Sequence, residues 1–170
     1  TIDVVRVFWK LMYLRTPLFS GGSFRLLYDT MWDNTKQMAE EIFNGIKEQD
    51  DKVRVKLINT STTDKNDVIT EVFKSKAILV GSPTINNGIL HSMAGILEMI
   101  KGLKFKNKDY AAFGSYGWSG ESVEILEDNM DSAGFNKVLD GIKVKWTPNK
   151  ENIDYLNSFG SNFIKKLDDK

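Results

Sequence analysis

The sequence predicts a doubly wound α/β domain: a five-stranded parallel sheet in the order 2-1-3-4-5, covered by helices on both faces. Short apolar stretches alternate with longer segments of helical periodicity from residue 23 onward. Parallel strands need a crossover between them, and a helix usually provides it. The chain has 170 residues, a length typical of one domain with a substantial core. We therefore assign residues 23–170 to this domain and residues 1–22 to an extra segment or linker.

The strands are predicted from the spacing of apolar residues. Segment 24–28 (FRLLY) is typical of a buried strand, and 52–58 (KVRVKLI) alternates with period two, as an edge strand does. Segment 77–82 (AILVGS) is apolar up to its turn residues, which indicates a central parallel strand. Small and aromatic residues mark a strand at 110–115, and 137–146 is expected to be an interrupted strand.

The helices are predicted at 34–49, 64–75, 92–102, 121–135 and 149–167. The second begins with an acidic turn, which suits the helix dipole, and the fourth has a glycine at its end. The inner faces of the first and last helices are expected to consist of Met38, Ile42, Phe43 and Ile46, and of Ile153, Leu156, Phe159, Phe163 and Leu167.

Composition excludes several classes of function. Lys plus Arg and Asp plus Glu number 23 each, so the formal net charge of zero argues against nucleic-acid binding and against a polybasic membrane anchor. The absence of cysteine excludes disulfides, Cys-ligated zinc and iron–sulfur clusters, and favours a cytoplasmic setting. The single histidine, His91, excludes a metal site built on several imidazoles, and no catalytic role is assigned to it.

The N-terminal segment is apolar from Val4 to Leu14 but contains Arg6 and Lys10. It is too short and too charged to span a bilayer, and it lacks the cleavage site of a signal peptide. We expect an amphipathic element or linker, followed by a hinge at residues 20–22 (SGG).

Three loops should lie at the carboxyl edge of the sheet, where ligands bind in such folds. The first is DTMWDNT (29–35), which lacks the lysine of a P-loop. Thr30, Asn34 and Thr35 offer side-chain donors beside the N–H groups of a helix start, an arrangement that suits a phosphate. The alternative is a plain helix cap formed by Asn34 or Asp33.

The second loop is GSPTINNG (81–88). Thr84, Asn86 and Asn87 offer donors and acceptors in a loop anchored by proline, and Gly88 permits a positive φ. These groups suit a heterocycle edge or a polyol chain. The alternative is a Pro-Gly turn that leads into a helix.

The third loop is GSYGWSGE (114–121). Its glycines, Gly114, Gly117 and Gly120, would let the backbone approach a ligand. Tyr116 and Trp118 are suited to stacking on a planar ring, which is worth roughly 1–3 kcal/mol per base in nucleic-acid complexes. The alternative is an exposed aromatic patch for a protein partner. A phosphate, a polar chain and a flat ring together match the layout of flavin mononucleotide (FMN).

The motifs YDTMWDNT, AILVGSPTINNG and AAFGSYGWSGE, in this order, resemble the flavodoxin-like domain at the C-terminal end of flavodiiron proteins, the A-type flavoproteins. The resemblance runs from about Phe24 to the end of the chain. It implies a flavodoxin-like fold and an FMN site. The implied residues are Thr30, Met31, Trp32, Asn34 and Thr35 near the phosphate and the flavin, Pro83, Thr84, Ile85, Asn86, Asn87 and Gly88 along the ribityl chain and ring edge, and Ser115, Tyr116, Gly117, Trp118 and Gly120 around the ring.

In that family FMN passes electrons to a di-iron domain that reduces oxygen or nitric oxide. The resemblance implies a similar electron-transfer role, with a donor such as rubredoxin or a flavin/NADH reductase. A head-to-tail homodimer is common in the family and stays open for this chain. One histidine cannot supply the di-iron centre, so this chain alone is not expected to be a complete reductase.

Other functions on the same fold stay open. A phosphorelay receiver fits poorly, because it needs an acidic pair at the end of its first strand and an aspartate after its third. This chain has Asp29 near the end of the first strand, and the third ends in GSPT, which contains no aspartate. A cofactor-free docking or signalling module would use the loop aromatics as a protein-binding patch. An FMN-dependent NAD(P)H quinone reductase would need a nicotinamide site, which the sequence does not reveal.

Overall fold

A computed structural model describes residues 23–169, so the expectations for residues 1–22 lie outside the described residues. The elements follow in the order β1 (Ser23–Tyr28), α2 (Asn34–Gln49), β2 (Arg54–Asn59), α3 (Lys65–Lys74), β3 (Ala77–Gly81), α4 (His91–Leu103), β4 (Asp109–Tyr116), α5 (Ser122–Ser132), β5 (Asn136–Lys137), β6 (Ile142–Lys145) and α6 (Lys150–Asp168). No helix in this part of the chain combines the length and the apolar character needed to cross a membrane.

The sheet confirms the predicted topology. Its strands run in the order β2-β1-β3-β4-β5, and every pair is parallel. The predicted interruption of the last strand is real: β5 pairs with the start of β4 at Asp109 and Tyr110, and β6 pairs with its end from Phe113 to Tyr116. The two short strands therefore share the fifth position of the sheet.

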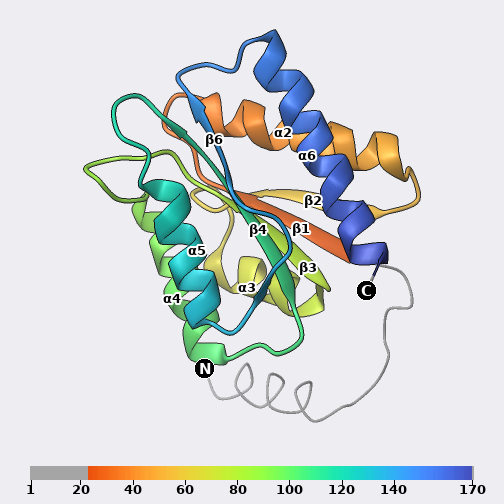
Figure 1. Ribbon diagram of the computed structural model, residues 1–170. Coiled ribbons are helices and arrows are strands. Elements are labelled where there is room, and N and C mark those ends of the chain that lie inside the picture. Colours follow the sequence, from red (N-terminus) through yellow and green to blue (C-terminus); the bar gives the residue numbers. More distant parts are fainter. Residues whose placement is uncertain (1–22, 170) are drawn as a thin grey trace.

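Helices cover both faces of the sheet. Figure 1 shows α2 and α6 together on one face, with α3, α4 and α5 on the other. Successive residues of a strand point to opposite faces, so Leu26 packs with the first pair of helices and Leu27 with the other three. Strand β3, which is buried on both faces, is wholly apolar, and β1 is apolar apart from Ser23 and Arg25. Strand β2 at the edge alternates, with Arg54 and Lys56 exposed.

The helix ends follow the local sequence. Asp64 caps α3 by accepting a hydrogen bond from the Asn66 N–H at 2.8 Å. At α6 the Asn149 side chain accepts from the Asn152 N–H at 2.9 Å, and the reciprocal bond completes a capping box. Helix α5 ends earlier than predicted because Gly134, with φ 82°, turns the chain away.

Helices α2 and α6 touch through their backbones. A Cβ atom on Gly45 would lie 2.0 Å from the Asn157 carbonyl oxygen, and one on Gly160 would lie 2.2 Å from the Ile42 carbonyl oxygen. Only glycine allows so close a crossing. This contact fixes the helix whose N-terminus begins at the first ligand loop.

Lys108 is a buried cation at the opposite, amino-terminal edge of the sheet. Its Nζ donates to the Phe73 carbonyl at 3.0 Å and also to the Ser75 carbonyl, both at the end of α3, and lies 5.7 Å from the centre of the Phe105 ring. Burial, with a smaller contribution from the charge of Arg25, lowers the pKa of Lys108 to about 8.

This pKa predicts a pH-dependent stability. The folded protein releases the Lys108 proton near pH 8, whereas the unfolded chain keeps it up to the usual lysine pKa of 10.5. The free energy of unfolding therefore rises with pH between these two values, and this contribution is lost as the pH falls through about 8. We expect the free energy of unfolding to rise by about 1–3 kcal/mol between pH 8 and pH 10, relative to Lys108→Met. Urea unfolding at both pH values checks this, and parallel pH profiles of the two proteins would contradict it.

Candidate functional site

The three predicted loops lie at one edge of the sheet. Residues 29–33 follow β1, residues 82–90 follow β3 and residues 117–121 follow β4. All three leave the carboxyl ends of their strands at the upper left of Figure 1, where the turn after β6 (residues 146–149) also lies. Strand order reverses around β1 and β3, so this is the edge at which the fold places ligands.

Ser115 joins the three loops. Its Oγ lies 2.8 Å from the Oγ1 of Thr35 at the start of α2, and its carbonyl accepts from the Thr84 N–H at 2.9 Å. The Thr84 hydroxyl in turn accepts from the Ser122 N–H at 3.1 Å, where α5 begins. Thr35 and Ser115 are both buried, so their hydroxyls serve this junction.

The Thr35–Ser115 bond should show non-additive mutational costs. Ser115→Ala leaves the Thr35 hydroxyl buried without this partner, which should lower the free energy of unfolding by about 1–3 kcal/mol. In the Thr35→Val background, which lacks that hydroxyl, Ser115→Ala should lower the free energy of unfolding by clearly less than it does in wild type. Urea unfolding of wild type, both single variants and the double variant measures the difference, and additive losses would show that the bond does not link the loops.

The first loop carries two features suited to an anion. Asp33 is the N-cap residue of α2, with φ 60°, but its side chain makes no capping hydrogen bond. The Thr30 Oγ1 is buried and has no hydrogen-bond partner among the described residues. A buried hydroxyl without a partner costs free energy, so this atom is available for a hydrogen bond to a ligand. Asn34 is engaged differently, because its Oδ1 accepts from the Thr147 hydroxyl at 3.1 Å.

The Asp29 side chain holds the first loop in place through hydrogen bonds. Its side chain is buried, accepts from the Thr30 N–H at 2.8 Å and accepts from the Ser92 hydroxyl on α4. Burial raises the pKa of Asp29, while the hydrogen bonds from Thr30 and Ser61 and the charge of His91 oppose that rise. The carboxylate therefore holds the turn that presents Thr30.

The second loop contains a tight turn made by two asparagines. The Ile85 N–H donates to the Gly88 carbonyl at 3.1 Å, and the Gly88 N–H donates to the Ile85 carbonyl at 2.8 Å. The two residues between them, Asn86 and Asn87, have φ values of 49° and 56°. The positive φ that Gly88 would permit is not used, because the exposed asparagines adopt the left-handed conformation themselves. Pro83 is buried beneath this turn.

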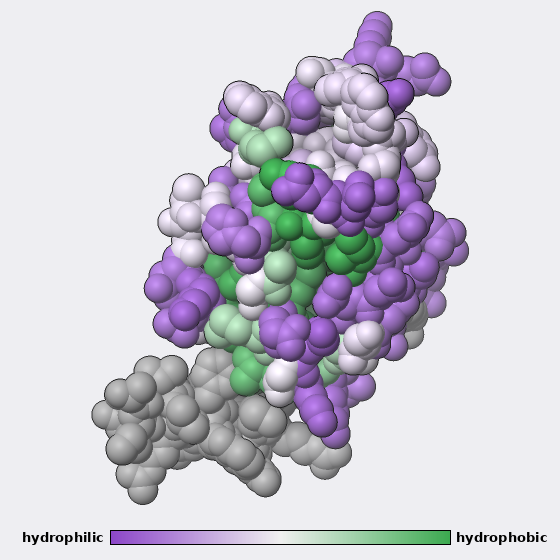
Figure 2. All heavy atoms as spheres, turned by 90° about the vertical axis from the view of Figure 1, so that its left-hand side faces the viewer, coloured by the Kyte–Doolittle hydropathy of each residue, from purple (hydrophilic) through white to green (hydrophobic). Residues whose placement is uncertain are grey.

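Aromatic and sulfur-containing side chains are exposed in the first and third loops. Trp32 is 78% exposed, Trp118 is 92% exposed and Met31 is 46% exposed, whereas Tyr116 is half-buried. Figure 2 views the molecule from the side that carries the second and third loops, and there hydrophobic residues form a central area bordered by hydrophilic ones. Large flat side chains without cover at a ligand edge fit a planar ring.

The glycines of the third loop are explained by packing. A Cβ on Gly114 would lie 2.7 Å from the Ser82 carbonyl oxygen, and one on Gly117 would lie 2.8 Å from the Trp146 ring. A Cβ on Gly120 would lie 3.3 Å from the Lys143 side chain. At Gly114 the Ser82 backbone leaves no space for a side chain, and at Gly117 a side chain would displace the Trp146 ring. A ligand is not needed to explain either glycine.

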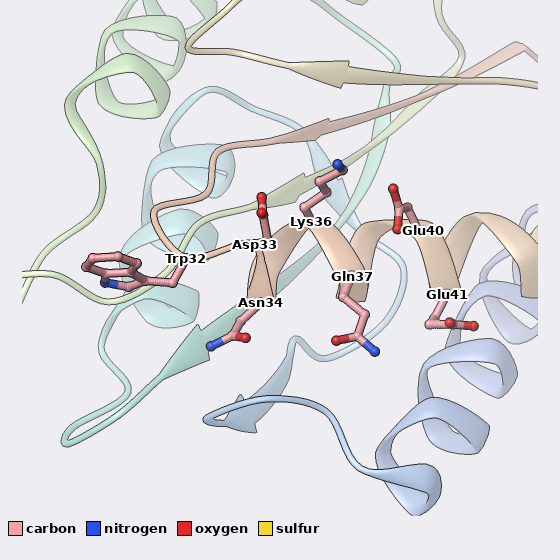
Figure 3. A pocket seen from close by; sticks show the side chains of 7 residues that line it. All are labelled: Trp32, Asp33, Asn34, Lys36, Gln37, Glu40 and Glu41. Atoms are coloured by element: carbon pink, nitrogen blue, oxygen red, sulfur yellow. The ribbon is translucent and has the colours of Figure 1, made fainter.

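A pocket of about 500 Å³ lies along the start of α2. Figure 3 shows the side chains of Asp33 and Lys36 on one side of the helix, those of Asn34 and Gln37 on the other, and Trp32 extending away from its start. Glu40 and Glu41 complete the lining. Of the predicted site residues only Trp32 and Asn34 line this polar surface, so it is a neighbour of the three-loop edge and not the slot for a flat ring.

Sequence reasoning missed the turn after β6. Trp146 contacts the position of Gly117, and Thr147 bonds Asn34, so both touch predicted site residues. The pattern of residues 137–146 gave Trp146 only as the last residue of a strand. A tryptophan directly before Thr-Pro, a pair that favours a turn, is the signal that could have identified it. Within residues 23–169 no cluster of three or more His, Asp or Glu could hold a metal ion.

The residues at this edge fit FMN. The unpartnered Thr30 hydroxyl and the α2 N-terminus, which no side chain caps, suit its phosphate. The Asn86–Asn87 turn offers exposed polar groups for the ribityl chain and ring edge, and Trp32 and Trp118 offer flat surfaces for the ring. The three loops together thus offer groups that suit each chemical part of FMN.

Comparisons with known proteins agree with this fold. The family model for flavodoxin matches residues 26–159. The chain is 43% identical over 135 residues to the anaerobic nitric oxide reductase flavorubredoxin of Escherichia coli O1:K1 / APEC, a match that covers 79% of this chain and 28% of that protein. The chain therefore corresponds to less than a third of the length of such relatives.

Solved structures give the same picture. Rubredoxin oxygen:oxidoreductase from Desulfovibrio gigas superposes with a TM-score of 0.79 at 34% identity, over 85% of this chain and 37% of that one. The Flv1 flavodiiron core from Synechocystis sp. PCC6803 gives 0.82 at 26% identity, over 99% and 41%. A flavodoxin from the domain Archaea gives 0.76 at 27% identity, over 86% and 99%. The chain belongs to the flavodoxin family and is closely related to the flavodoxin-like domain of flavodiiron proteins.

Proposed function

We propose that this domain binds FMN at the three-loop edge and transfers electrons through it. The buried Thr30 Oγ1 without a partner, beside the uncapped start of α2, is the observation that carries the proposal. Membership of the flavodoxin family supports FMN as the cofactor. FMN supplies the redox chemistry when it is bound, and the protein binds it, orients it and limits its access to water.

The residues of the site take four roles in this proposal. Thr30 and the N–H groups at the start of α2 hold the phosphate, while Met31, Trp32, Tyr116 and Trp118 contact the ring. The loop from Pro83 to Gly88 follows the ribityl chain and the ring edge. The spacing of the site is set by Thr35, Thr84 and Ser115. The hydroxyls of Thr35 and Ser115 bond each other, and Thr84 bonds the Ser115 carbonyl and the Ser122 N–H. No side chain is assigned as an acid, a base or a nucleophile.

We infer the partners from the names of the relatives. A flavorubredoxin and a rubredoxin oxygen:oxidoreductase both point to rubredoxin as an electron donor, and a flavin/NADH reductase is the second donor class that we consider. A di-iron domain is the proposed acceptor, because the related structures include flavodiiron proteins. A cytoplasmic location, which the cysteine-free sequence favours, suits these donors.

Titration with FMN tests the proposal. About 31 heavy atoms at about 0.3 kcal/mol each give roughly 9 kcal/mol, or a Kd below about 1 μM. Tryptophan fluorescence should therefore fall as FMN is added and saturate at one equivalent, and the loaded protein should be yellow. A cofactor-free docking module would leave the fluorescence unchanged, and that result would overturn the proposal.

Electron transfer needs a second measurement. The FMN-loaded protein, reduced by NADH and a separate flavin reductase, should pass electrons to cytochrome c as a generic acceptor, while the FMN-free protein should not. Consumption of NADH with a quinone and without any separate reductase would favour the quinone reductase alternative.

A further inference from the structure

Trp146 has a backbone conformation that is rare for a large residue. It follows β6 with φ 60°, in the left-handed region, and its indole is 57% exposed. Its N–H donates to the Tyr116 carbonyl at 2.8 Å, which ties it to the end of β4. A bulky side chain held at positive φ and left partly in solvent indicates that its position matters more than its burial.

The indole of Trp146 explains why residue 117 is glycine. A Cβ on Gly117 would lie 2.8 Å from both Cη2 and Cζ3 of the indole, closer than such atoms approach one another. Gly134 is the glycine with positive φ in residues 23–169, so Gly117 has no conformational need to be glycine. A side chain at this position would therefore require the indole to move away.

The same turn reaches the first ligand loop. The Thr147 hydroxyl donates to Asn34 Oδ1 at 3.1 Å at the start of α2, one residue after the indole that covers Gly117. We propose that the turn after β6 is a fourth element of the flavin site, in which Trp146 is a positioning residue that holds the third loop at Gly117. This inference rests on the proposed function.

Holding Gly117 should matter for the ring and not for the phosphate. Gly117 lies between Tyr116 and Trp118, the two aromatic residues of the third loop. Without the indole these side chains must be ordered when the ligand binds, and ordering each one costs about as much as a severalfold to tenfold change in affinity. We expect Trp146→Ala to weaken the binding of FMN and of riboflavin by the same factor, roughly tenfold, because both ligands contain the ring.

The first experiment measures Kd for FMN and for riboflavin by flavin fluorescence, in wild type, Trp146→Ala and Trp146→Phe. Phenylalanine should restore much of the affinity for both ligands. Tyr155→Ala is the matched control, because this aromatic is 60% exposed on α6 and should leave both Kd values unchanged. Urea unfolding confirms that each variant is folded. Unchanged Kd values in folded Trp146→Ala, or a loss for FMN alone, would overturn the proposal.

A double-mutant cycle tests the contact itself. In the wild-type background Gly117→Ala should weaken the binding of both flavins, because its Cβ meets the indole. In the Trp146→Ala background, which lacks the ring, the same substitution should have little effect on either Kd. If Gly117→Ala changed the two Kd values equally in both backgrounds, the proposed contact between the Trp146 indole and Gly117 would be contradicted.

Hydrogen exchange of the FMN-free protein tests whether Trp146 orders the third loop, independently of flavin binding. The amides of residues 117–121 should exchange faster in Trp146→Ala than in wild type, and equal exchange would overturn the positioning role. If wild type binds neither flavin, the proposed function fails and the flavin role of Trp146 fails with it, while the exchange rates still decide whether the indole holds the loop.

Discussion

Replacing Thr30 with valine is expected to weaken FMN binding by roughly tenfold to a hundredfold. A hydrogen bond to a charged group is worth about 1.5–3 kcal/mol, and valine removes it with little change in shape. The FMN-free protein should become more stable by about 1 kcal/mol, because its buried hydroxyl has no partner within residues 23–169. A gain in stability combined with a loss of affinity distinguishes a ligand-binding hydroxyl from a structural one.

Riboflavin, which lacks the phosphate, provides the internal control. Its Kd should be nearly the same for wild type and Thr30→Val, and Thr30→Ser should retain most of the FMN affinity. Thr70→Val on α3 is a matched change, because the Thr70 hydroxyl donates to Asn66 within that helix. Equal losses for FMN and riboflavin in Thr30→Val would place the hydroxyl near the ring and remove the phosphate assignment.

Gly45→Ala is expected to lower the free energy of unfolding by about 2–4 kcal/mol. The new Cβ would lie 2.0 Å from the Asn157 carbonyl oxygen, so α2 and α6 would have to separate. Separation would also move the start of α2, which carries the first ligand loop, and FMN affinity should fall with stability. Urea unfolding and an FMN titration measure the two effects.

Gly95→Ala is the control for this prediction. Gly95 lies within α4, is exposed, and a Cβ there meets nothing within 4 Å. Alanine should therefore stabilise the protein by about 0.5–1 kcal/mol, since glycine is the poorer helix residue. If Gly45→Ala behaved like Gly95→Ala, the two helices would not be packed as closely as described.

Periodicity was enough to predict the architecture from the sequence. Parallel strands buried on both faces, such as β3, are short apolar runs, and α2 shows its inner face through Met38, Ile42 and Ile46, which are fully buried. Helix bounds agreed to within a few residues, and the largest difference, at the end of α5, came from Gly134 ending the helix early.

Contacts between distant segments could not be predicted in the same way. The sequence offered Gly88 for a positive φ, but Asn86 and Asn87 adopt it, since asparagine tolerates that conformation and sets the turn locally. Gly117 looked like a residue that admits a ligand, yet Trp146, distant in sequence, occupies the space beside it. Thr35 is predicted to lie near the phosphate, and the structure adds a bond from its hydroxyl to Ser115 that residue spacing did not suggest. The Gly117 and Thr35 contacts depend on which distant segments meet, and residue spacing does not report that.

An amide NMR titration with FMN tests the three-loop site most directly. Residues 29–35, 82–90 and 114–121 should all shift, with one common Kd and saturation at one equivalent, while the amides around Lys108 at the opposite edge stay unchanged. Shifts confined to one loop, or different Kd values for different loops, would contradict a single FMN bound by all three.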